Sequence, residues 1–187
     1  SGGLVGSEMC IRDRSKCNPK KIKTCKLDVV FHPRVARTIL AHFASLVNGS
    51  SIVRGSSFLK EKLNHKIFHD EINIIDNPMI VRGLSSKPFD DEGCSMNELS
   101  LVKNGVLKNW LLDTTTSKQL GMTSNSRASR GVSSPPTPSH TNLFIDNGNK
   151  STEQILNEVN NGFYVTDLIG QGVNSVSYTH LRAHETS

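Results

Sequence analysis

The sequence predicts an α+β fold, with a mainly antiparallel sheet and a few short flanking helices. Three observations lead to this class. Apolar residues recur at helical spacing between Val35 and Val47, and Asn104-Gly105 lies between two apolar runs. The predicted helices and strands also follow one another irregularly, without the strand–helix alternation that is typical of a parallel sheet.

The N-terminal part of the chain is expected to hold one strand and two helices. Residues 27–31 form a short run of β-prone residues. Pro33 suits the first turn of a helix, and the apolar stripe of that helix ends at Asn48-Gly49, which is a typical C-terminal stop. A second, shorter helix is expected over residues 57–63.

From residue 72 onward the apolar pattern indicates strands. One strand is expected over residues 72–75, and a hairpin is expected from residues 99–102 and 106–112. Asn104-Gly105 lies between the two arms of this hairpin. A type I′ turn favours this pair because both of its central residues need a positive φ.

The last third of the chain alternates between short elements and one long loop. A helix is expected over residues 115–120, and residues 123–140 are too rich in Ser, Pro and Gly to form a regular element. A strand then follows over residues 142–145. The sequence Ser-Thr-Glu-Gln has the form of a capping box, so it predicts a helix over residues 151–160. Residues 163–169 are expected to form the final strand.

The two ends of the chain are related at the level of DNA. Residues 4–11 (LVGSEMCI) and 178–185 (YTHLRAHE) can be encoded by opposite strands of one DNA sequence, and the relation extends over residues 2–14 and 175–187. Unrelated protein ends would almost never match in this way, and the DNA resembles a transposon-end sequencing adaptor. We therefore expect residues 1–14 and 175–187 to be adaptor-derived and not native.

The chain is moderately basic. It carries 22 Lys and Arg against 17 Asp and Glu, a formal net charge of +5. Lysines cluster in residues 15–26, which resemble a linker leading into the domain. Residues 16–26 could therefore recruit acidic partners in a basic, non-enzymatic interaction domain. No aromatic residue is interleaved with these lysines to stack on bases, so no nucleic-acid partner is expected.

Cysteine usage and hydropathy indicate the compartment. Outside the expected adaptor segments there are three cysteines, Cys17, Cys25 and Cys94, with no C-x-x-C motif. An odd number without this motif predicts neither a disulfide framework nor a zinc knuckle, and it fits a reducing environment. No apolar run approaches the roughly 20 residues that a membrane span needs. We therefore expect a cytoplasmic protein without a membrane partner.

Two polar clusters are candidates for chemistry. His65 and His69 have the i, i+4 spacing that places two imidazoles on one face of a helix, and with Asp70 they could serve a self-sufficient metallohydrolase. No Glu adjoins either histidine as in H-E-x-x-H, which favours a polar loop. Residues 90–93, Asp-Asp-Glu-Gly, could hold a cation, although a solvated acidic turn is the simpler interpretation.

Several stretches together resemble the TldD/PmbA family of bacterial and archaeal proteases in both order and spacing. They are VVFHPRVARTILAHF (29–43), RGSSFLKEKL (54–63), INIIDNP (72–78), RGLSSKPFDDEG (82–93), LVKNGVLKNWLLDT (101–114), SRASRGVSSPPTPSHTNLF (126–144) and GFYVTDLIGQGVN (162–174). The resemblance implies that residues 27–174 are a truncated C-terminal domain of this family. The N-terminal domain and the end of the C-terminal domain would then be absent.

This family has two kinds of subunit that pair. The TldD kind carries H-E-x-x-x-H on a helix shortly before an Arg-Lys-Gly-Thr-Ser-type segment and holds a zinc ion there, whereas the PmbA kind, also called TldE, lacks the motif. By spacing from Arg54, the motif would occupy residues 40–45 here. Leu40 and Ser45 replace its histidines and Ala41 replaces its glutamate. These residues supply neither nitrogen ligands nor a carboxylate base.

The resemblance therefore implies a zinc-free PmbA/TldE-like subunit without catalytic or metal-binding residues of its own. Zinc is expected in a TldD-like partner, and the heterodimer would degrade or mature unstructured peptides. His42 lies inside the motif window but out of register, and His32 replaces the family's usual Asp before Pro33. The long Ser/Pro loop and its exit are matched between the two kinds of subunit. The residues expected to line the shared cavity or interface are Arg127, Arg130, Thr141 and Asn142.

Overall fold

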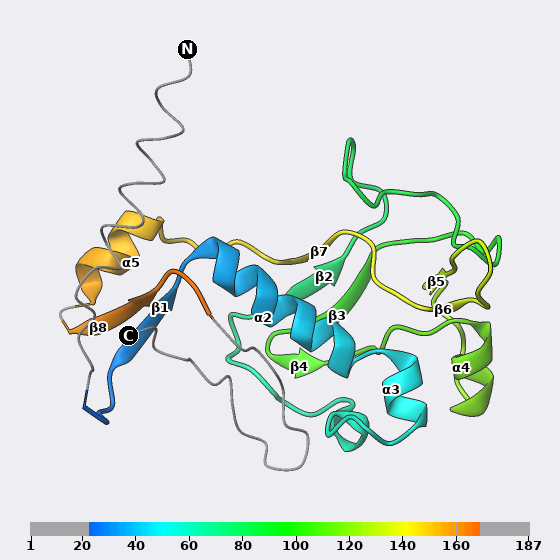
Figure 1. The fold of residues 1–187 in the computed structure, drawn as a ribbon, viewed down its shortest axis with the longest axis horizontal. Coiled ribbons are helices and arrows are strands. Elements are labelled where there is room, and N and C mark those ends of the chain that lie inside the picture. The colour runs from blue at the N-terminus through cyan, green and yellow to red at the C-terminus, as the bar shows by residue number, and fades with distance from the viewer. Residues whose placement is uncertain (1–22, 160, 169–187) are drawn as a thin grey trace.

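A four-stranded antiparallel sheet forms the centre of the fold (Figure 1). The computed structural model describes residues 23–159 and 161–168, so the expected adaptor segments and most of the basic linker lie outside the described residues. The strand order is β4-β3-β2-β7, and neighbouring strands pair antiparallel. The strands are β2 (Ile74–Asp76), β3 (Leu99–Lys103), β4 (Val106–Leu107) and β7 (Leu143–Ile145). The predicted α+β class with a mainly antiparallel sheet is confirmed.

The β3–β4 hairpin has the predicted turn. Asn104 and Gly105 have φ values of 50° and 73°, as a type I′ turn requires. The second arm is shorter than expected, because β4 ends at Leu107 and residues 108–112 leave the sheet. Leu111 instead donates its N–H to the Val47 carbonyl at 2.9 Å, so the end of the first helix takes the hydrogen bond that a longer strand would have used.

Helix α2 (Pro33–Leu46) is the longest helix in the described part of the chain, and it ends near the predicted stop. His32 caps it, since its Nδ1 accepts a hydrogen bond from the Arg34 N–H at 3.2 Å. A second helix, α3 (Gly49–Val53), follows directly and was not predicted. Asn48 caps its N-terminus, because the Asn48 side chain accepts a hydrogen bond from the Ser50 N–H.

The predicted helix over residues 57–63 is wrong, because this segment contains only the 3₁₀ turn η1 (Lys60–Lys62). The physical cause is the Ser57 side chain. Its Oγ donates to the Leu46 carbonyl at 2.6 Å and accepts from the Leu59 N–H at 3.2 Å. Local hydrogen bonds of this kind compete with helix formation.

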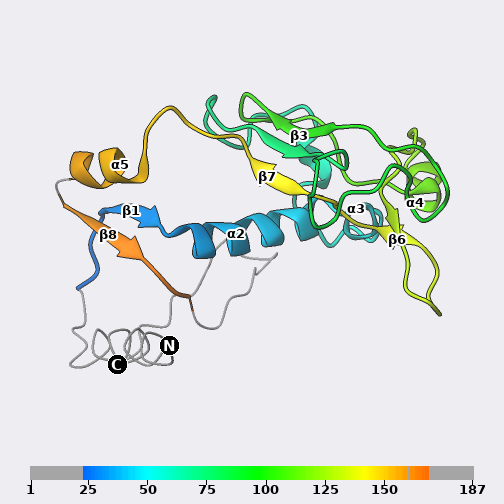
Figure 2. The ribbon, with the colours of Figure 1, turned by 90° about the horizontal axis from the view of Figure 1, so that it is seen from above.

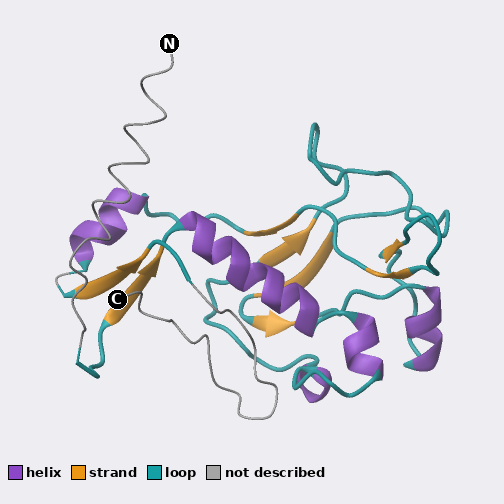
Figure 3. Ribbon diagram, viewed as in Figure 1, coloured by secondary structure: helices purple, strands orange, loops and turns teal. Residues whose placement is uncertain are grey.

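The expected helix near residue 115 is α4 (Thr114–Gln119), which Asp113 caps through a capping box with Thr116. The following loop was expected to lack regular elements. That expectation is wrong in one detail, because β5 (Ala128–Ser129) and β6 (Thr137–Pro138) pair antiparallel within it. The two strands are too short to leave a periodic signal in the sequence. Figure 3 shows that loops also form the whole connection between β2 and β3.

A second, separate sheet lies beyond the N-terminal end of α2 (Figure 2). It consists of β1 (Asp28–Phe31) and β8 (Gly162–Val165), which pair in parallel beside α5 (Thr152–Glu158). The predicted capping box of α5 is confirmed. Parallel sheets are normally covered on both faces, yet Val29 is 49% exposed and Phe163 is 41% exposed in this pair.

The hydrophobic core lies between α2 and the four-stranded sheet. Its buried members include Leu40 and Phe43 from α2, Ile74 from β2, and the segment 110–112 that leaves the hairpin.

In the described part of the chain, every helix is too short or too polar to cross a membrane.

Candidate functional site on helix α2

The zinc-motif positions lie on the second half of α2. Leu40 is 9% exposed and belongs to the hydrophobic core, whereas Ala41 and Ser45 are exposed. The Ser45 Oγ donates to the Ala41 carbonyl at 3.1 Å, so this hydroxyl already bonds within the helix. An alkyl chain, a methyl group and a helix-bonded hydroxyl do not fit a zinc ion, which requires imidazole, thiolate or carboxylate ligands.

Leu40 and Ala41 face a pocket that we call the α2–β7 pocket. Its volume is about 410 Å³, and it is lined by Arg37, Leu40, Ala41, Leu84, Ser85, His140, Thr141, Asn142 and Leu143. Two of the four predicted site residues, Thr141 and Asn142, therefore face the motif positions across one pocket. Ser45 lies in a neighbouring pocket of about 340 Å³ with Asn48, Arg54 and Pro138.

Arg127, the third predicted site residue, is enclosed within the chain. It is 1% exposed and pairs through Nε with the Oδ2 atom of Asp76, which is 0% exposed. Its two terminal nitrogens donate to the carbonyl oxygens of Asn125, Ser126, Asp76 and Asn97. Each of the five guanidinium N–H groups thus has an acceptor, and Arg127 lines neither pocket.

The Arg127–Asp76 pair positions the wall of the α2–β7 pocket. The other carboxylate oxygen of Asp76, Oδ1, accepts hydrogen bonds from the N–H and the Oγ1 of Thr141 at 2.7 and 3.0 Å. Asn142 continues this bracing, because its side chain bonds to Ser85 N, Asn77 O and Ser86 Oγ. The buried Arg127–Asp76 pair therefore joins β2 to the loop exit, and Asn142 joins the loop exit to residues 85–86. A role of these residues in a peptide cavity or subunit interface stays a prediction.

Arg130, the fourth predicted residue, is exposed and is held through its backbone by the acidic turn. Its N–H donates to Asp91 Oδ2 at 2.8 Å, and Lys87 donates to Asp91 Oδ1 at 3.0 Å. The Arg130 N–H, followed by Lys87, holds the pKa of Asp91 below its usual value.

The turn formed by residues 90–93 is an anchor and not a solvated acidic turn, which corrects the simpler interpretation. Asp90 is buried and accepts hydrogen bonds from the N–H groups of Glu92, Cys94 and Ala128. The Glu92 carboxylate accepts from the N–H and hydroxyl of Thr114, the first residue of α4. These carboxylate oxygens accept hydrogen bonds from the protein itself, so fewer of their lone pairs are available to bind a cation.

The geometry of the described residues does not support the paired-histidine hypothesis. No helix includes His65 or His69, so the i, i+4 spacing does not place the two rings on one face. The His65 ring lies 3.0 Å from the Leu63 carbonyl, and the His69 ring accepts from the Glu71 N–H at 3.5 Å. Asp70 pairs with Lys66 at 2.8 Å. Within residues 23–159 and 161–168, no group of three or more His, Cys, Asp or Glu side chains is arranged to hold a metal.

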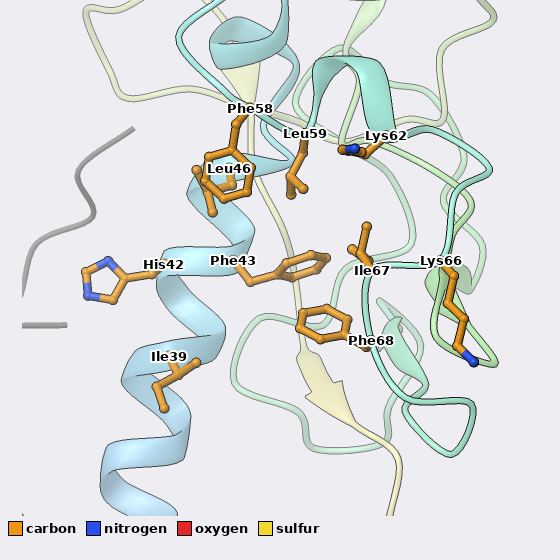
Figure 4. A pocket seen from close by; sticks show the side chains of 10 residues that line it. All are labelled: Ile39, His42, Phe43, Leu46, Phe58, Leu59, Lys62, Lys66, Ile67 and Phe68. Atoms are coloured by element: carbon orange, nitrogen blue, oxygen red, sulfur yellow. The ribbon is translucent and has the colours of Figure 1, made fainter. Parts of the chain in front are cut away.

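The opposite side of α2 borders a larger apolar groove, which we call the Phe43 groove (Figure 4). It has a volume of about 620 Å³ and is lined by Ile39, His42, Phe43, Leu46, Phe58, Leu59, Lys62, Lys66, Ile67 and Phe68. Phe43 and Phe68 meet edge to face, with their ring centroids 5.7 Å apart. The His42 ring points away from these aromatic rings, and its Nε2 has no hydrogen-bond partner among the described residues.

Sequence reasoning missed three residues that shape the site. Asp76 follows the strand expected over residues 72–75 and was given no role, although its carboxylate organises both Arg127 and Thr141. Arg37 and His140 line the α2–β7 pocket from segments about a hundred residues apart. No local signal could have shown any of these contacts, because each depends on tertiary packing.

Comparisons with known protein sequences and structures identify the family of this chain. The family sequence model described as PmbA/TldA metallopeptidase C-terminal domain matches residues 24–182. Metalloprotease PmbA of Escherichia coli O157:H7 is 33% identical over 178 residues, which cover 95% of this chain and 38% of that protein. A PmbA homologue of Haemophilus influenzae is 34% identical over 178 residues, with the same two coverages. The chain therefore spans 38% of the length of these two relatives.

Solved structures show the same architecture. A candidate modulator of DNA gyrase from Bacteroides thetaiotaomicron superposes with a TM-score of 0.79 at 28% identity, covering 91% of this chain and 36% of that one. TldE from Thermococcus kodakarensis has a TM-score of 0.69 at 24% identity, with 90% and 40% covered, and at this identity it shows the fold alone. Because the family model and the PmbA sequences match most of its length, this chain belongs to the PmbA/TldA, or TldD/PmbA, metallopeptidase family and carries the fold of its C-terminal domain.

Proposed function

We propose that this chain is part of a zinc-free PmbA/TldE-like subunit in a TldD/TldE-type metalloprotease complex. In this proposal a TldD-like partner holds the zinc ion, and the cytoplasmic heterodimer degrades or matures unstructured peptides. The observation that carries the proposal is the set of residues Leu40, Ala41 and Ser45 on α2, because it leaves the motif positions without a zinc ligand or a carboxylate base.

The site geometry supports a role in peptide handling. Thr141 and Asn142 line a pocket against the motif face of α2, and the buried Arg127–Asp76 pair fixes the loop that carries them. A wall held by buried hydrogen bonds is suited to forming one side of a chamber, since it keeps its shape without the partner.

Two alternatives are weaker. A self-sufficient metallohydrolase would use His65 and His69, which are exposed and lie on a loop without a third ligand within the described residues. A basic interaction domain would use residues 16–26, most of which lie outside the described residues. Salt-sensitive binding of nucleic acid by the chain would favour this second alternative.

The test uses the full-length natural protein and a TldD-like subunit. Alone, the protein should bind no stoichiometric zinc and should cleave no unstructured peptide. Mixed with the TldD-like subunit, it should form a complex whose peptidase activity is lost on chelation. Replacing His65 and His69 together by alanine should leave this activity intact. If the double variant still assembled but lost both zinc and activity, the paired-histidine alternative would be correct.

A further inference from the structure

Arg37 and His140 are the two basic side chains that line the α2–β7 pocket. Arg37 lines the pocket from α2, and His140 lines it from the segment before β7. Neither side chain has a hydrogen-bond or ion-pair partner among the described residues. Two other polar side chains of this wall already have partners, because Thr141 donates to Asp76 and the Asn142 amide bonds to three groups of neighbouring loops. Ser85 adds a hydroxyl group to the lining.

The pocket carries positive charge without a balancing carboxylate. None of its lining residues is acidic. The Asp76 carboxylate, which accepts hydrogen bonds from the lining residue Thr141, is 0% exposed and is paired with Arg127. An arginine offers a planar fork of N–H donors that matches a carboxylate, and an imidazole adds a further N–H donor.

The remaining walls are apolar. Leu40, Ala41, Leu84 and Leu143 contribute alkyl surface around the two basic groups. The volume of about 410 Å³ lies within the range of roughly 300–1,000 Å³ that is common for small-ligand pockets. An apolar wall beside a charged donor fits a group that carries an anion next to a hydrophobic side chain.

We propose that the α2–β7 pocket binds a carboxylate of a peptide, with Arg37 and His140 as donors and the leucine walls holding the adjoining side chain. The peptide nature of this ligand rests on the proposed function. The carboxylate can be a C-terminal carboxyl group or an Asp or Glu side chain, which present the same chemistry to the pocket.

Ala41, which stands where the zinc motif has a glutamate, keeps this pocket open to a carboxylate. Position 41 is four residues after Arg37 on α2, so a glutamate there would face Arg37 one helical turn away. It would pair with the guanidinium and repel an incoming carboxylate. Alanine leaves both the space and the charge of Arg37 available.

The test measures peptide binding by the full-length natural protein, alone and with the TldD-like subunit. The probes are short unstructured peptides with a neutral dye: one without acidic side chains and with a free C-terminal carboxylate, its C-terminal amide, and an amide that carries one Glu. At least one carboxylate peptide should bind more tightly than the neutral amide, and the peptide that does so identifies the source of the carboxylate.

The variants separate a specific contact from general attraction. Arg37→Gln should weaken binding of the carboxylate peptide about tenfold, as expected for losing a hydrogen bond to a charged group, and should leave the neutral amide unaffected. Arg34→Gln, with the same charge change on the same helix but outside the pocket, should have little effect. Ala41→Glu should weaken binding much as Arg37→Gln does, whereas Ala41→Gln, of nearly equal size but neutral, should not.

Two results would overturn the inference. One is binding of the neutral amide that equals the binding of both carboxylate peptides, and the other is equal losses with Arg34→Gln and Arg37→Gln. Failure of the proposed function is seen separately. In that case the mixture with the TldD-like subunit shows no peptidase activity while carboxylate binding still depends on Arg37. That result would reject the proposed complex and retain the proposed binding site.

Discussion

Arg127 and Asp76 form a buried ion pair between residues 51 positions apart in the sequence. The pair lies behind Thr141 and links β2 to both ends of the loop between α4 and β7. A buried ion pair is stable only when its remaining donors and acceptors are also satisfied. That condition is met here, because the arginine uses all five N–H groups and both Asp76 carboxylate oxygens accept hydrogen bonds.

Replacing Arg127 with methionine should destabilise the domain strongly. The substitution leaves the Asp76 carboxylate buried without its cation, and such a loss costs about 3–5 kcal/mol. Urea unfolding of the variant and the natural protein measures the difference. Arg130→Met is the matched control, since Arg130 is exposed and bonds to Asp91 through its backbone. Similar losses from the two substitutions would contradict a structural role for the Arg127–Asp76 pair.

Gly105→Ala should also lower the free energy of unfolding. Gly105 has a φ of 73°, and a Cβ there would clash with the Phe68 carbonyl oxygen. The left-handed conformation alone costs an L-residue about 1–2 kcal/mol, and the backbone contact adds to this. Gly148→Ala is the control, because a Cβ at Gly148 meets no atom within 4 Å. Thermal unfolding that shifts equally for both variants would show that the turn tolerates a side chain.

Asp91→Asn should alter the pH dependence of stability in the acid range. The folded-state pKa of Asp91 is lowered by the Arg130 N–H and then by Lys87, from an ordinary value of 3.8. The contribution of Asp91 to stability is therefore complete above that ordinary value and is lost as the pH falls through the lower folded-state pKa. Urea unfolding of the two proteins should differ at pH 6 and converge toward pH 2. A difference that stays constant over this range would rule out titration of Asp91 as its cause.

The parallel β1–β8 pair should promote self-association of this chain. A two-stranded sheet with apolar faces and open edges is a template for further pairing. Val29→Lys should therefore reduce the association measured by light scattering at micromolar concentration. Val132→Lys is the control, because Val132 is also exposed but lies in a loop. If the unaltered chain is a monodisperse monomer that unfolds cooperatively, the pair does not need a covering partner.

Features that depend on neighbouring residues were predictable. The turn at Asn104-Gly105 and the capping box that begins at Ser151 both formed as expected, because their hydrogen bonds and φ requirements close within four residues. The helix predicted over residues 57–63 did not form for the opposite reason, because a non-local contact decides its conformation. The Ser57 hydroxyl found its partner in the Leu46 carbonyl, 11 positions away, and periodicity does not reveal such a contact.

By itself, the sequence determined the α+β class, the family resemblance and the absence of zinc ligands at Leu40, Ala41 and Ser45, since each of these is a property of residue type and local spacing. The tertiary structure alone decided that Arg127 is enclosed with Asp76, and that Arg37 and His140 share one pocket. The physical reason is that burial and charge pairing depend on which distant segments pack together, and this packing is determined by the whole chain and not by any local segment.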